Sequence, residues 1–522
     1  MRRVHDLLAS AADAASSSVG WVFKDQELSF REMQERSDRI AAGLLRNGIK
    51  PGDRVAVLST TTPDWVAVYF ATAKIGAVLV CLSVRYRETE LAHIISDSGA
   101  RMVITVPFHE STDFLSILAK LRRGLPQLET VVTFGRGGDS TFDELLDASI
   151  DNRRLAEAEA AVTPRDPVMI IYTSGTTGKP KGATLTHGGQ LAAAQAQAQH
   201  MRLHNRDVLP AAVPLNHVSG ITCCVLAALV AHARVILLET FDSREIAALF
   251  GTADLTLWVG VPTMHTLLLN RPELDVADTS KVRLVVTGGA NAEPALLERL
   301  TTRFPNATVM NLYGLSETSG AVVMTSWDDD RDTLARSIGR PLTGVEIKIA
   351  DTTGTEVPIG QTGELMVRSP SLMAGYGNMP DETANALDQG WLHTGDMACM
   401  SEHGSITLSG RAKEMFVQGG FTIYPIEVEN VLTTHPDVVM AAGVGVPDPV
   451  LGEIGRYYVV LAPDAETTEE DLEAFCSTRI ADYKVPKEVV IRAELPLTPA
   501  DKIQKSSLDS NPRVPDAKGP EK

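Results

Sequence analysis

The first 400 residues alternate short apolar runs with longer stretches of helical spacing. Residues 55–59 (VAVLS) precede the helix-like stretch 61–76, and residues 78–82 (VLVCL) precede the amphipathic stretch 88–100. A further apolar run, MVIT, follows at residues 102–105. Strand patterns that alternate with helix patterns are typical of βαβ units with a parallel sheet. The sequence therefore predicts an α/β fold in this region.

The same alternation returns later, and there each apolar run is followed by a distinctive loop. The runs lie at residues 168–172 (VMIIY), 283–287 (RLVVT) and 308–312 (TVMNL). Parallel α/β sheets place their ligands at the carboxyl ends of the strands. We therefore expect the three loops to gather around one ligand site.

The pattern changes after about residue 337. VEIKIAD, GELMVRS and ITLSG are strand-like and are separated by Gly, Pro and Asp turns, which predicts a small β-rich subdomain. Beyond Arg411, two helix-like and two strand-like stretches predict a compact α+β unit. We expect an N-terminal domain over 1–412 with two βαβ-type sheet subdomains and the β-rich subdomain, a C-terminal domain over 413–506, and a flexible tail over 507–522.

Composition and charge exclude several classes of function. The chain has 522 residues, 44% of them hydrophobic, which is enough for more than one buried core. Its 48 basic and 66 acidic residues give a net charge of −18, which repels nucleic-acid phosphates and anionic membrane surfaces. We expect no nucleic-acid partner and no membrane insertion. Nothing in the sequence indicates an oligomeric state.

The cysteines and the apolar segments predict a cytoplasmic protein. Five cysteines without a CxxC pair are typical of free thiols in a reducing compartment. The start of the chain lacks the sustained apolar run of a signal peptide. The most membrane-like stretch, residues 218–231, is shorter than a bilayer span, so we expect a buried core element there.

The strongest local signal is residues 172–182, YTSGTTGKPKG, directly after an apolar run. Its glycines let the backbone approach phosphate oxygens, its hydroxyls donate hydrogen bonds, and Lys179 and Lys181 supply positive charge. Pro180 stands where a Walker A loop needs Ser or Thr, so the segment is not that motif. A solvated Gly/Ser/Thr linker is the alternative. The position after a buried strand favours a polyphosphate site.

This loop resembles the signature of the adenylate-forming superfamily, which includes acyl-CoA synthetases, luciferases and adenylation domains of peptide synthetases. Further segments of the chain resemble the family's other motifs in order, so that the resemblance covers about residues 20 to 506. It implies ATP, Mg²⁺ and coenzyme A as cofactors. It also implies a mobile C-terminal domain that turns about a hinge near Lys413.

The resemblance implies roles for a nucleotide site. Tyr313, in the segment 311–318, stacks on adenine, Glu317 binds Mg²⁺, and Asp396 and Arg411 share the ribose. Taken alone, Glu317 could be a helix N-terminal carboxylate, Asp396 a turn residue and Arg411 a surface ion-pair partner. The full set of nucleotide-binding residues that it implies is Thr173, Ser174, Gly175, Thr176, Thr177, Gly178, Lys179, Lys181, Gly289, Ala290, Asn311, Leu312, Tyr313, Gly314, Ser316, Asp396 and Arg411.

Catalysis is implied for Lys502, in LPLTPADKIQK, with Thr318 and His217 beside it. An ammonium at this place bridges the attacking carboxylate and the α-phosphate. A lysine near a chain end is otherwise usually solvated. Asp501 departs from the family pattern, which has Gly before the lysine, and a carboxylate there can pair with the ammonium or repel ATP. One hypothesis is therefore an enzyme with weakened adenylation that still forms the thioester.

The remaining implied sites concern the acid and the thiol. Gly419, Gly420, Phe421 and the hinge residue Lys413 line the tunnel for coenzyme A, although the glycine pair could also be a simple hairpin turn. The acyl pocket is implied for His217, Trp258, Val259, Gly260, Ala290 and Gly314. A lone histidine is more often an ordinary core residue. The small or apolar character of the others favours an apolar or ring-bearing acid.

The function implied is an ATP-dependent acid–thiol ligase that forms an acyl-adenylate from a small carboxylic acid and passes the acyl group to coenzyme A. A carrier-protein thiol is an alternative acceptor, and a non-catalytic nucleotide-binding protein is an alternative from another class. Retention of Lys502, Glu317, Asp396 and Arg411 favours the enzyme.

Overall fold

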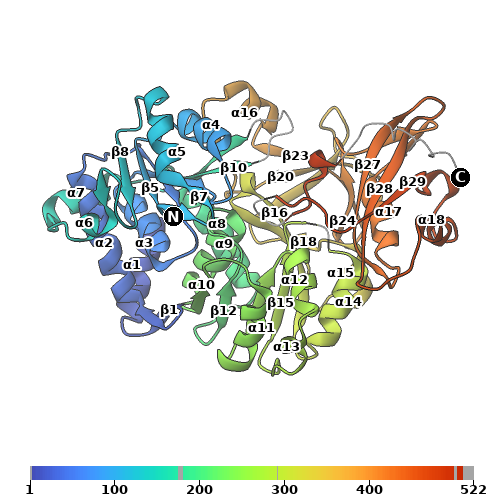
Figure 1. The fold of residues 1–522 in the computed structure, drawn as a ribbon, viewed down its shortest axis with the longest axis horizontal. Coiled ribbons are helices and arrows are strands. Elements are labelled where there is room, and N and C mark those ends of the chain that lie inside the picture. The colour runs from blue at the N-terminus through green and yellow to red at the C-terminus, as the bar shows by residue number, and fades with distance from the viewer. Residues whose placement is uncertain (1–2, 174–179, 291, 499–501, 509–522) are drawn as a thin grey trace, which may run out of the picture.

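The computed structural model describes residues 3–173, 180–290, 292–498 and 502–508. These residues form five sheets of four or more strands and one two-stranded sheet, β6 (Phe108–His109) with β7 (Thr112–Asp113). Figure 1 shows the N-terminal elements, in blue and cyan, at one end of the molecule and the C-terminal unit, in red, at the other.

The largest sheet has a parallel centre covered by helices on both faces. Along β3, Val55 and Val57 pack into the core that holds α3, and Ala56 and Leu58 pack into the core that holds α4 and α5. Strands buried on both faces read as continuous apolar runs, which is why this pattern appeared in the sequence. In spatial order the strands are β21 (Gly375–Tyr376), β11 (Lys181–Thr186), β10 (Pro167–Thr173), β4 (Val78–Leu82), β3 (Arg54–Leu58), β5 (Met102–Thr105), β8 (Thr130–Thr133) and β9 (Ser140–Thr141).

Local signals set where the surrounding helices begin. Ser29 and Glu32 form a reciprocal capping box at the start of α2, and the Thr62 hydroxyl accepts from Trp65 N at the start of α3. The helices of this part are α1 (Val4–Ala14), α2 (Phe30–Arg46), α3 (Pro63–Lys74), α4 (Glu88–Ser98), α5 (Phe114–Leu121), α6 (Phe142–Leu146) and α7 (Asn152–Ala161).

A second α/β region follows along the chain. Its five-stranded sheet has three parallel strands, β14 (Leu257–Gly260), β15 (Leu284–Gly288) and β16 (Thr308–Leu315), followed by antiparallel β17 (Gly320–Met324) and β18 (Arg340–Pro341). A four-stranded sheet joins β12 (Val208–Ala211) and β13 (Arg234–Leu237) to the N-terminal hairpin β1 (Val19–Phe23) and β2 (Gln26–Ser29). The helices are α8 (His187–His200), α11 (Ser243–Thr252), α12 (Pro262–Leu269), α13 (Pro272–Asp275), α14 (Pro294–Arg303) and α15 (Arg331–Arg336). The prediction of two βαβ-type subdomains is confirmed.

The apolar stretch 218–231 lies inside this part of the molecule. It forms α9 (Val218–Gly220), a π-helical turn at Ile221–Leu226 and α10 (Ala227–Val230), and its residues from Ile221 to Leu229 are buried. Among the described residues, no helix has the length and apolarity needed to cross a membrane. The prediction of a buried core element is confirmed.

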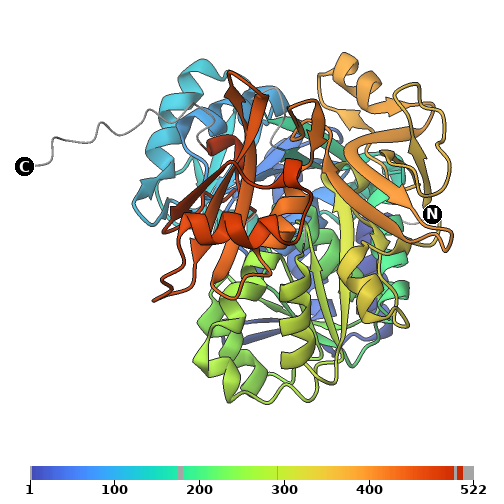
Figure 2. The same ribbon diagram turned by 90° about the vertical axis from the view of Figure 1, so that its right-hand side faces the viewer.

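A smaller antiparallel sheet comes next, and then a separate C-terminal unit. The sheet contains β19 (Glu346–Ala350), β20 (Gly363–Arg368), β23 (Trp391–Met400), β22 (Leu387–Asp388) and β24 (Ile406–Arg411), with α16 (Pro380–Ala386) beside it. The C-terminal unit has its own core and its own sheet, which faces the viewer in Figure 2. Its elements are β25 (Phe416–Gln418), β26 (Phe421–Ile423), α17 (Pro425–Leu432), β27 (Val438–Asp448), β28 (Gly452–Leu461), α18 (Glu469–Ser477) and β29 (Glu488–Arg492). The predicted β-rich and α+β units are confirmed.

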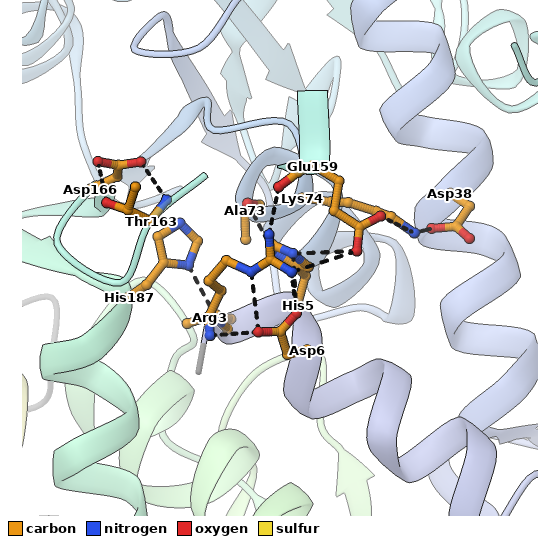
Figure 3. A network of polar contacts seen from close by, with 11 residues as sticks. Arg3, His5, Asp6, Asp38, Ala73, Lys74, Glu159, Thr163, Asp166 and His187 are labelled. Carbon is orange, nitrogen blue, oxygen red and sulfur yellow. Dashed lines mark hydrogen bonds and ion pairs between the residues drawn. The ribbon is translucent and has the colours of Figure 1, made fainter. Parts of the chain in front are cut away.

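A buried polar network attaches α1 to the rest of the molecule (Figure 3). His5 Nδ1 lies 3.2 Å from Ala73 O, and His5 Nε2 lies 3.5 Å from Asp6 Oδ1 and 3.6 Å from Glu159 Oε1. These three side chains are close enough to hold a metal ion. However, the guanidinium of Arg3 and the ammonium of Lys74 lie beside the two carboxylates and already balance their charge. We therefore assign the cluster a structural role.

This network makes stability depend on pH. Burial, and then the charge of Arg3, lower the pKa of His5 to about 4, and burial lowers the pKa of the neighbouring His187 to about 3. Because the unfolded histidine has a pKa near 6.5, the unfolded state binds the proton first as the pH falls. We expect the free energy of unfolding to fall between about pH 6.5 and 4 by roughly 3 kcal/mol from His5 alone, and the contribution of His187 to be lost down to about pH 3.

Urea unfolding of the wild type and of His5→Gln at pH 7 and pH 4.5 measures this effect. The variant is expected to lose less stability between the two pH values than the wild type. Replacement of the exposed His403 by Gln is the matched control and should leave the pH dependence unchanged. An equal pH dependence in wild type and His5→Gln would contradict the assignment.

Candidate active site

Asp396 lies at the centre of a buried polar cluster. It stands on β23 directly opposite Arg411 of β24, and Arg411 Nε donates to Asp396 Oδ1 at 2.9 Å. The hydroxyl of Tyr313, on β16, donates to Asp396 Oδ2 at 2.5 Å. Burial raises the pKa of Asp396, and the charge of Arg411 acts against that rise. The three residues that the sequence assigned to adenine and ribose therefore contact one another.

Glu317 lies on the turn that joins β16 to β17. Its carboxylate Oε1 accepts a hydrogen bond of 2.7 Å from the hydroxyl of Tyr376, on β21. Gly314 precedes this turn, and a Cβ atom there would lie 2.1 Å from the carbonyl oxygen of Gly320, so only glycine allows the two strands to approach. The sequence pointed to Glu317 but not to Tyr376, because a tyrosine after a glycine carries no chemical signal by itself.

Thr318 and Asn311 have structural contacts in place of the predicted ones. Thr318 is fully buried, and its hydroxyl accepts from Leu315 N and donates to Gly320 O at 2.7 Å, which stabilises the Glu317 turn. The amide nitrogen of Asn311 donates to Leu334 O at 2.9 Å and to Ser337 O, and so holds the end of α15. The roles that the resemblance implies for Thr318 in catalysis and for Asn311 in nucleotide binding stay predictions.

The phosphate loop connects two neighbouring antiparallel strands. Thr173 at the end of β10 pairs with Lys181 at the start of β11. The ammonium of Lys181 forms an ion pair with Glu382 of α16 and lies 5.4 Å from the centre of the Tyr376 ring. The other predicted phosphate-binding residues lie outside the described residues; they are Ser174, Gly175, Thr176, Thr177, Gly178 and Lys179. The predicted position of the loop after a buried strand is confirmed.

Lys502 reaches the same site from the far end of the chain. Its backbone pairs with Thr498, since Thr498 N donates to Lys502 O at 2.6 Å and Lys502 N donates to Thr498 Oγ1. Arg85, from the N-terminal part, donates to Thr498 O at 3.3 Å. The loop therefore contacts residues more than 400 positions away in the sequence.

The Lys502 side chain packs against Gly289, which follows β15. A Cβ atom on Gly289 would lie 3.2 Å from Lys502 Cε, so glycine leaves room for the lysine to pass. Burial, and then the charge of Arg411, lower the pKa of Lys502 to about 8, although Glu317 and Asp396 act in the opposite direction. The charges of Arg411, Glu317 and Asp396 therefore all act on the Lys502 ammonium.

His217 is electrostatically coupled to Lys502. It caps α9, and its Nδ1 lies 3.0 Å from Ser219 Oγ. Burial, and then the charge of Lys502, lower the pKa of His217 to about 3, so the ring is neutral at physiological pH. Because Nδ1 accepts from Ser219 N, the neutral ring carries its proton on Nε2, which can donate one hydrogen bond to a substrate oxygen.

Some of the predicted acyl-pocket residues lie at the ends of strands, and others are buried. Gly260 ends β14 and Ala290 is exposed on the loop after β15, so both lie at the carboxyl ends of parallel strands, where Gly314 also lies on β16. Val259 is buried on β14. Trp258 is fully buried in the neighbouring core, and its Nε1 donates to His265 Nδ1 at 2.7 Å. The Trp258 side chain thus packs in the core beneath β14, and its predicted place in the acyl pocket, like that of the other residues, stays a prediction.

The residues predicted for the coenzyme A tunnel lie on the C-terminal unit. Gly419 and Gly420 form the two-residue turn between β25 and β26, both with positive φ, as a simple hairpin turn requires. Phe421 is 53% exposed and its ring stacks 4.4 Å from that of Tyr483. Lys413 follows the last residue of β24 in a turn. The turn and exposed ring form a surface hairpin.

The residues around Glu317 fit a magnesium ion. Mg²⁺ is bound by one or two carboxylates together with waters and substrate phosphates, and it does not require a full protein cage. Glu317 is half-buried, supplies one carboxylate, and lies within electrostatic reach of Lys502. A triphosphate held beside Lys181 would supply the remaining oxygen ligands. The donor set is therefore suitable for this cation.

Comparisons with known proteins agree with this geometry. The profile of the AMP-binding enzymes matches residues 9–377, and that of the AMP-binding enzyme C-terminal domain matches residues 427–502. The chain is 34% identical over 494 residues to 3-[(3aS,4S,7aS)-7a-methyl-1,5-dioxo-octahydro-1H-inden-4-yl]propanoyl:CoA ligase from Rhodococcus jostii strain RHA1, covering 93% of this chain and 94% of that protein. It is 34% identical over 484 residues to feruloyl-CoA synthase from Amycolatopsis sp, covering 92% and 93%.

A comparison with solved structures also finds a similar enzyme. The crystal structure of ATP-bound MatB from Rhodopseudomonas palustris superposes with a TM-score of 0.83 at 27% identity, covering 97% of this chain and 98% of that one. The chain therefore belongs to the AMP-binding enzyme family, that is, to the adenylate-forming superfamily, as an ATP-dependent, AMP-forming ligase of its acyl-CoA synthetase branch.

Proposed function

We propose that the protein activates an apolar or ring-bearing carboxylic acid as its acyl-adenylate and transfers the acyl group to coenzyme A. One observation carries the proposal. The Lys502 side chain packs on Gly289, and the charges of Glu317, Asp396 and Arg411 act on its ammonium, so that the C-terminal unit contributes a cation to a site built from the N-terminal part. We take the boundary between the N-terminal and C-terminal domains at residues 412 and 413, between β24 and β25.

In the first step, Asp396 and Arg411 hold the ribose, and Tyr313 lies against the base. The substrate carboxylate attacks the α-phosphorus and pyrophosphate leaves, with Lys502 stabilising the charge that grows on the oxygens between them. A bound Mg²⁺ supplies charge neutralisation of the phosphates, and Glu317 is the carboxylate that would hold it. The neutral His217 borders the place where the acid reacts.

In the second step, the thiol attacks the carbonyl carbon of the acyl-adenylate and AMP leaves. We propose that the C-terminal domain first turns near Lys413, which withdraws Lys502 and brings Gly419, Gly420 and Phe421 to the site. The packing of Lys502 against Gly289 and the exposure of the glycine turn support this order, because they suit the first step. A cytoplasmic location and a flexible tail over 507–522 remain predictions.

The named relatives guide the choice of acid. Two of them carry the names of ligases for ring-bearing acids, a bicyclic propanoate and ferulate. The small residues at the strand ends, Gly260, Ala290 and Gly314, leave room for a bulky acyl group. We therefore propose substituted cinnamate-like acids and alicyclic propanoates as the first substrates to test.

A panel of such acids, with medium-chain fatty acids for comparison, tests the proposal. Each acid is incubated with Mg·ATP and coenzyme A, and acyl-CoA, AMP and pyrophosphate are followed by mass spectrometry. We expect all three products in equal amounts from at least one ring-bearing acid, and none without acid. Activity confined to amino acids, or to a carrier-protein thiol, would contradict the proposal.

The same panel decides the question raised by Asp501, which lies outside the described residues. Rapid pyrophosphate release with ATP and acid supports the full two-step reaction. Release that is absent, while a synthetic acyl-adenylate is still converted to acyl-CoA, would support an enzyme that catalyses the second step only.

A further inference from the structure

The Glu317 carboxylate is held by a neighbouring segment, residues 371–376. The hydroxyl of Tyr376 donates to Glu317 Oε1 at 2.7 Å, and Met373 N donates to the Glu317 carbonyl oxygen, also at 2.7 Å. The main chain and the side chain of Glu317 are therefore fixed by the same segment. Ser319 Oγ adds a third contact by donating to Ser371 O at 2.7 Å.

The segment itself is rigidly attached to the strand that leaves the phosphate loop. β21 pairs antiparallel with β11, with Tyr376 opposite Ala183. The backbone N–H of Tyr376 donates to Thr383 Oγ1 at 2.9 Å, and Gly377 N donates to Gly182 O at 2.9 Å. The main chain at Tyr376 is therefore held on both sides.

Tyr376 also contacts the charged end of that strand. The ammonium of Lys181 lies 5.4 Å from the centre of its ring, which is within the range of a cation–π contact, and pairs with Glu382. Burial, and then the charge of Glu317, raise the pKa of the Tyr376 hydroxyl. The hydroxyl therefore stays protonated and remains a donor at physiological pH.

We propose that Tyr376 is a positioning residue that orients the Glu317 carboxylate toward the divalent cation. This inference rests on the proposed function. A carboxylate that accepts one fixed hydrogen bond at Oε1 presents its remaining lone pairs in one direction. Mg²⁺ demands near-ideal octahedral geometry, so a freely rotating carboxylate binds it less well. Removing such an outer partner typically weakens metal affinity about 10- to 100-fold.

Tyr376→Phe tests the inference, since it keeps the ring beside Lys181 and removes only the hydroxyl. We expect the Mg²⁺ concentration that half-saturates ATP–pyrophosphate exchange to rise about 10-fold, with a rate at saturating Mg²⁺ close to that of the wild type. A second readout needs no acid. Binding of Mn²⁺ to the enzyme with a non-hydrolysable ATP analogue, followed by electron paramagnetic resonance, should weaken by the same factor.

Tyr69→Phe is the matched control. It also removes a hydrogen-bonded tyrosine hydroxyl, which donates to Gln190 Oε1 at 2.6 Å within the core and away from Glu317. It should lower the melting temperature without changing Mn²⁺ affinity. Unchanged Mn²⁺ affinity in Tyr376→Phe would overturn the inference. If wild type shows no exchange with any acid but Tyr376→Phe still weakens Mn²⁺ binding, the proposed substrate class fails and the inference stands.

Discussion

Replacing Lys502 with alanine is expected to slow acyl-adenylate formation about 100- to 1,000-fold, because it removes the ammonium that we propose stabilises charge between carboxylate and α-phosphate. The second step is expected to change little, since Lys502 would have left the site by then. Single-turnover pyrophosphate release measures the first step. Conversion of a synthetic acyl-adenylate to acyl-CoA measures the second.

The exposed Lys487, on the same C-terminal unit, provides the control, and its replacement by alanine should leave both steps unchanged.

The rate of the wild type is also expected to depend on pH. Because the pKa of Lys502 is lowered to about 8, kcat/KM for ATP should fall as the pH rises through that value and the ammonium loses its proton. Equal slowing of both steps in Lys502→Ala would contradict the assigned role.

Replacing Asp396 with asparagine is expected to raise the Kd for ATP about 10- to 100-fold. The side chain keeps its shape but loses its negative charge. That charge forms an ion pair with Arg411 and strengthens the hydrogen bond that the carboxylate accepts from the Tyr313 hydroxyl. Hydrogen bonds to charged groups contribute about 1.5–3 kcal/mol each. Calorimetric titration with a non-hydrolysable ATP analogue measures the effect.

Asp388→Asn is the matched control for this change, because Asp388 lies on the neighbouring strand β22 and is exposed. It should bind the analogue like the wild type. The melting temperature of each variant separates lost binding from lost folding. Wild-type affinity in folded Asp396→Asn would show that the nucleotide does not use this cluster.

Much of the fold could be predicted because its central strands are buried on both faces. Continuous apolar runs such as residues 168–172 and 283–287, when helical patterns follow them, indicate the central strands of a parallel sheet. The C-terminal unit was also recognisable, since its helices and strands alternate in the same way. The four-stranded sheet was not predicted, because β1 pairs with β13 more than 200 residues later and neither strand signals its partner.

The site was predicted only in part, because sequence motifs identify residue types but not the direction in which side chains point. Asn311 and Thr318 lie in the motif that also supplies Tyr313 and Glu317, yet their side chains hold the scaffold. Trp258 points into the core beneath its strand. Tyr376 came from outside the matched motifs, and only the strand pairing of β21 with β11 brings its hydroxyl to Glu317.

The measurement that tests the central claim most directly follows one oxygen atom. An acid labelled with ¹⁸O in both carboxylate oxygens is incubated with the enzyme, Mg·ATP and coenzyme A. If the carboxylate attacks the α-phosphorus, the bridging oxygen stays with phosphorus when the thiol takes the acyl group. We predict one ¹⁸O atom in each AMP and none in pyrophosphate. Unlabelled AMP, or label in a phosphate released from the β–γ end of ATP, would contradict an acyl-adenylate intermediate.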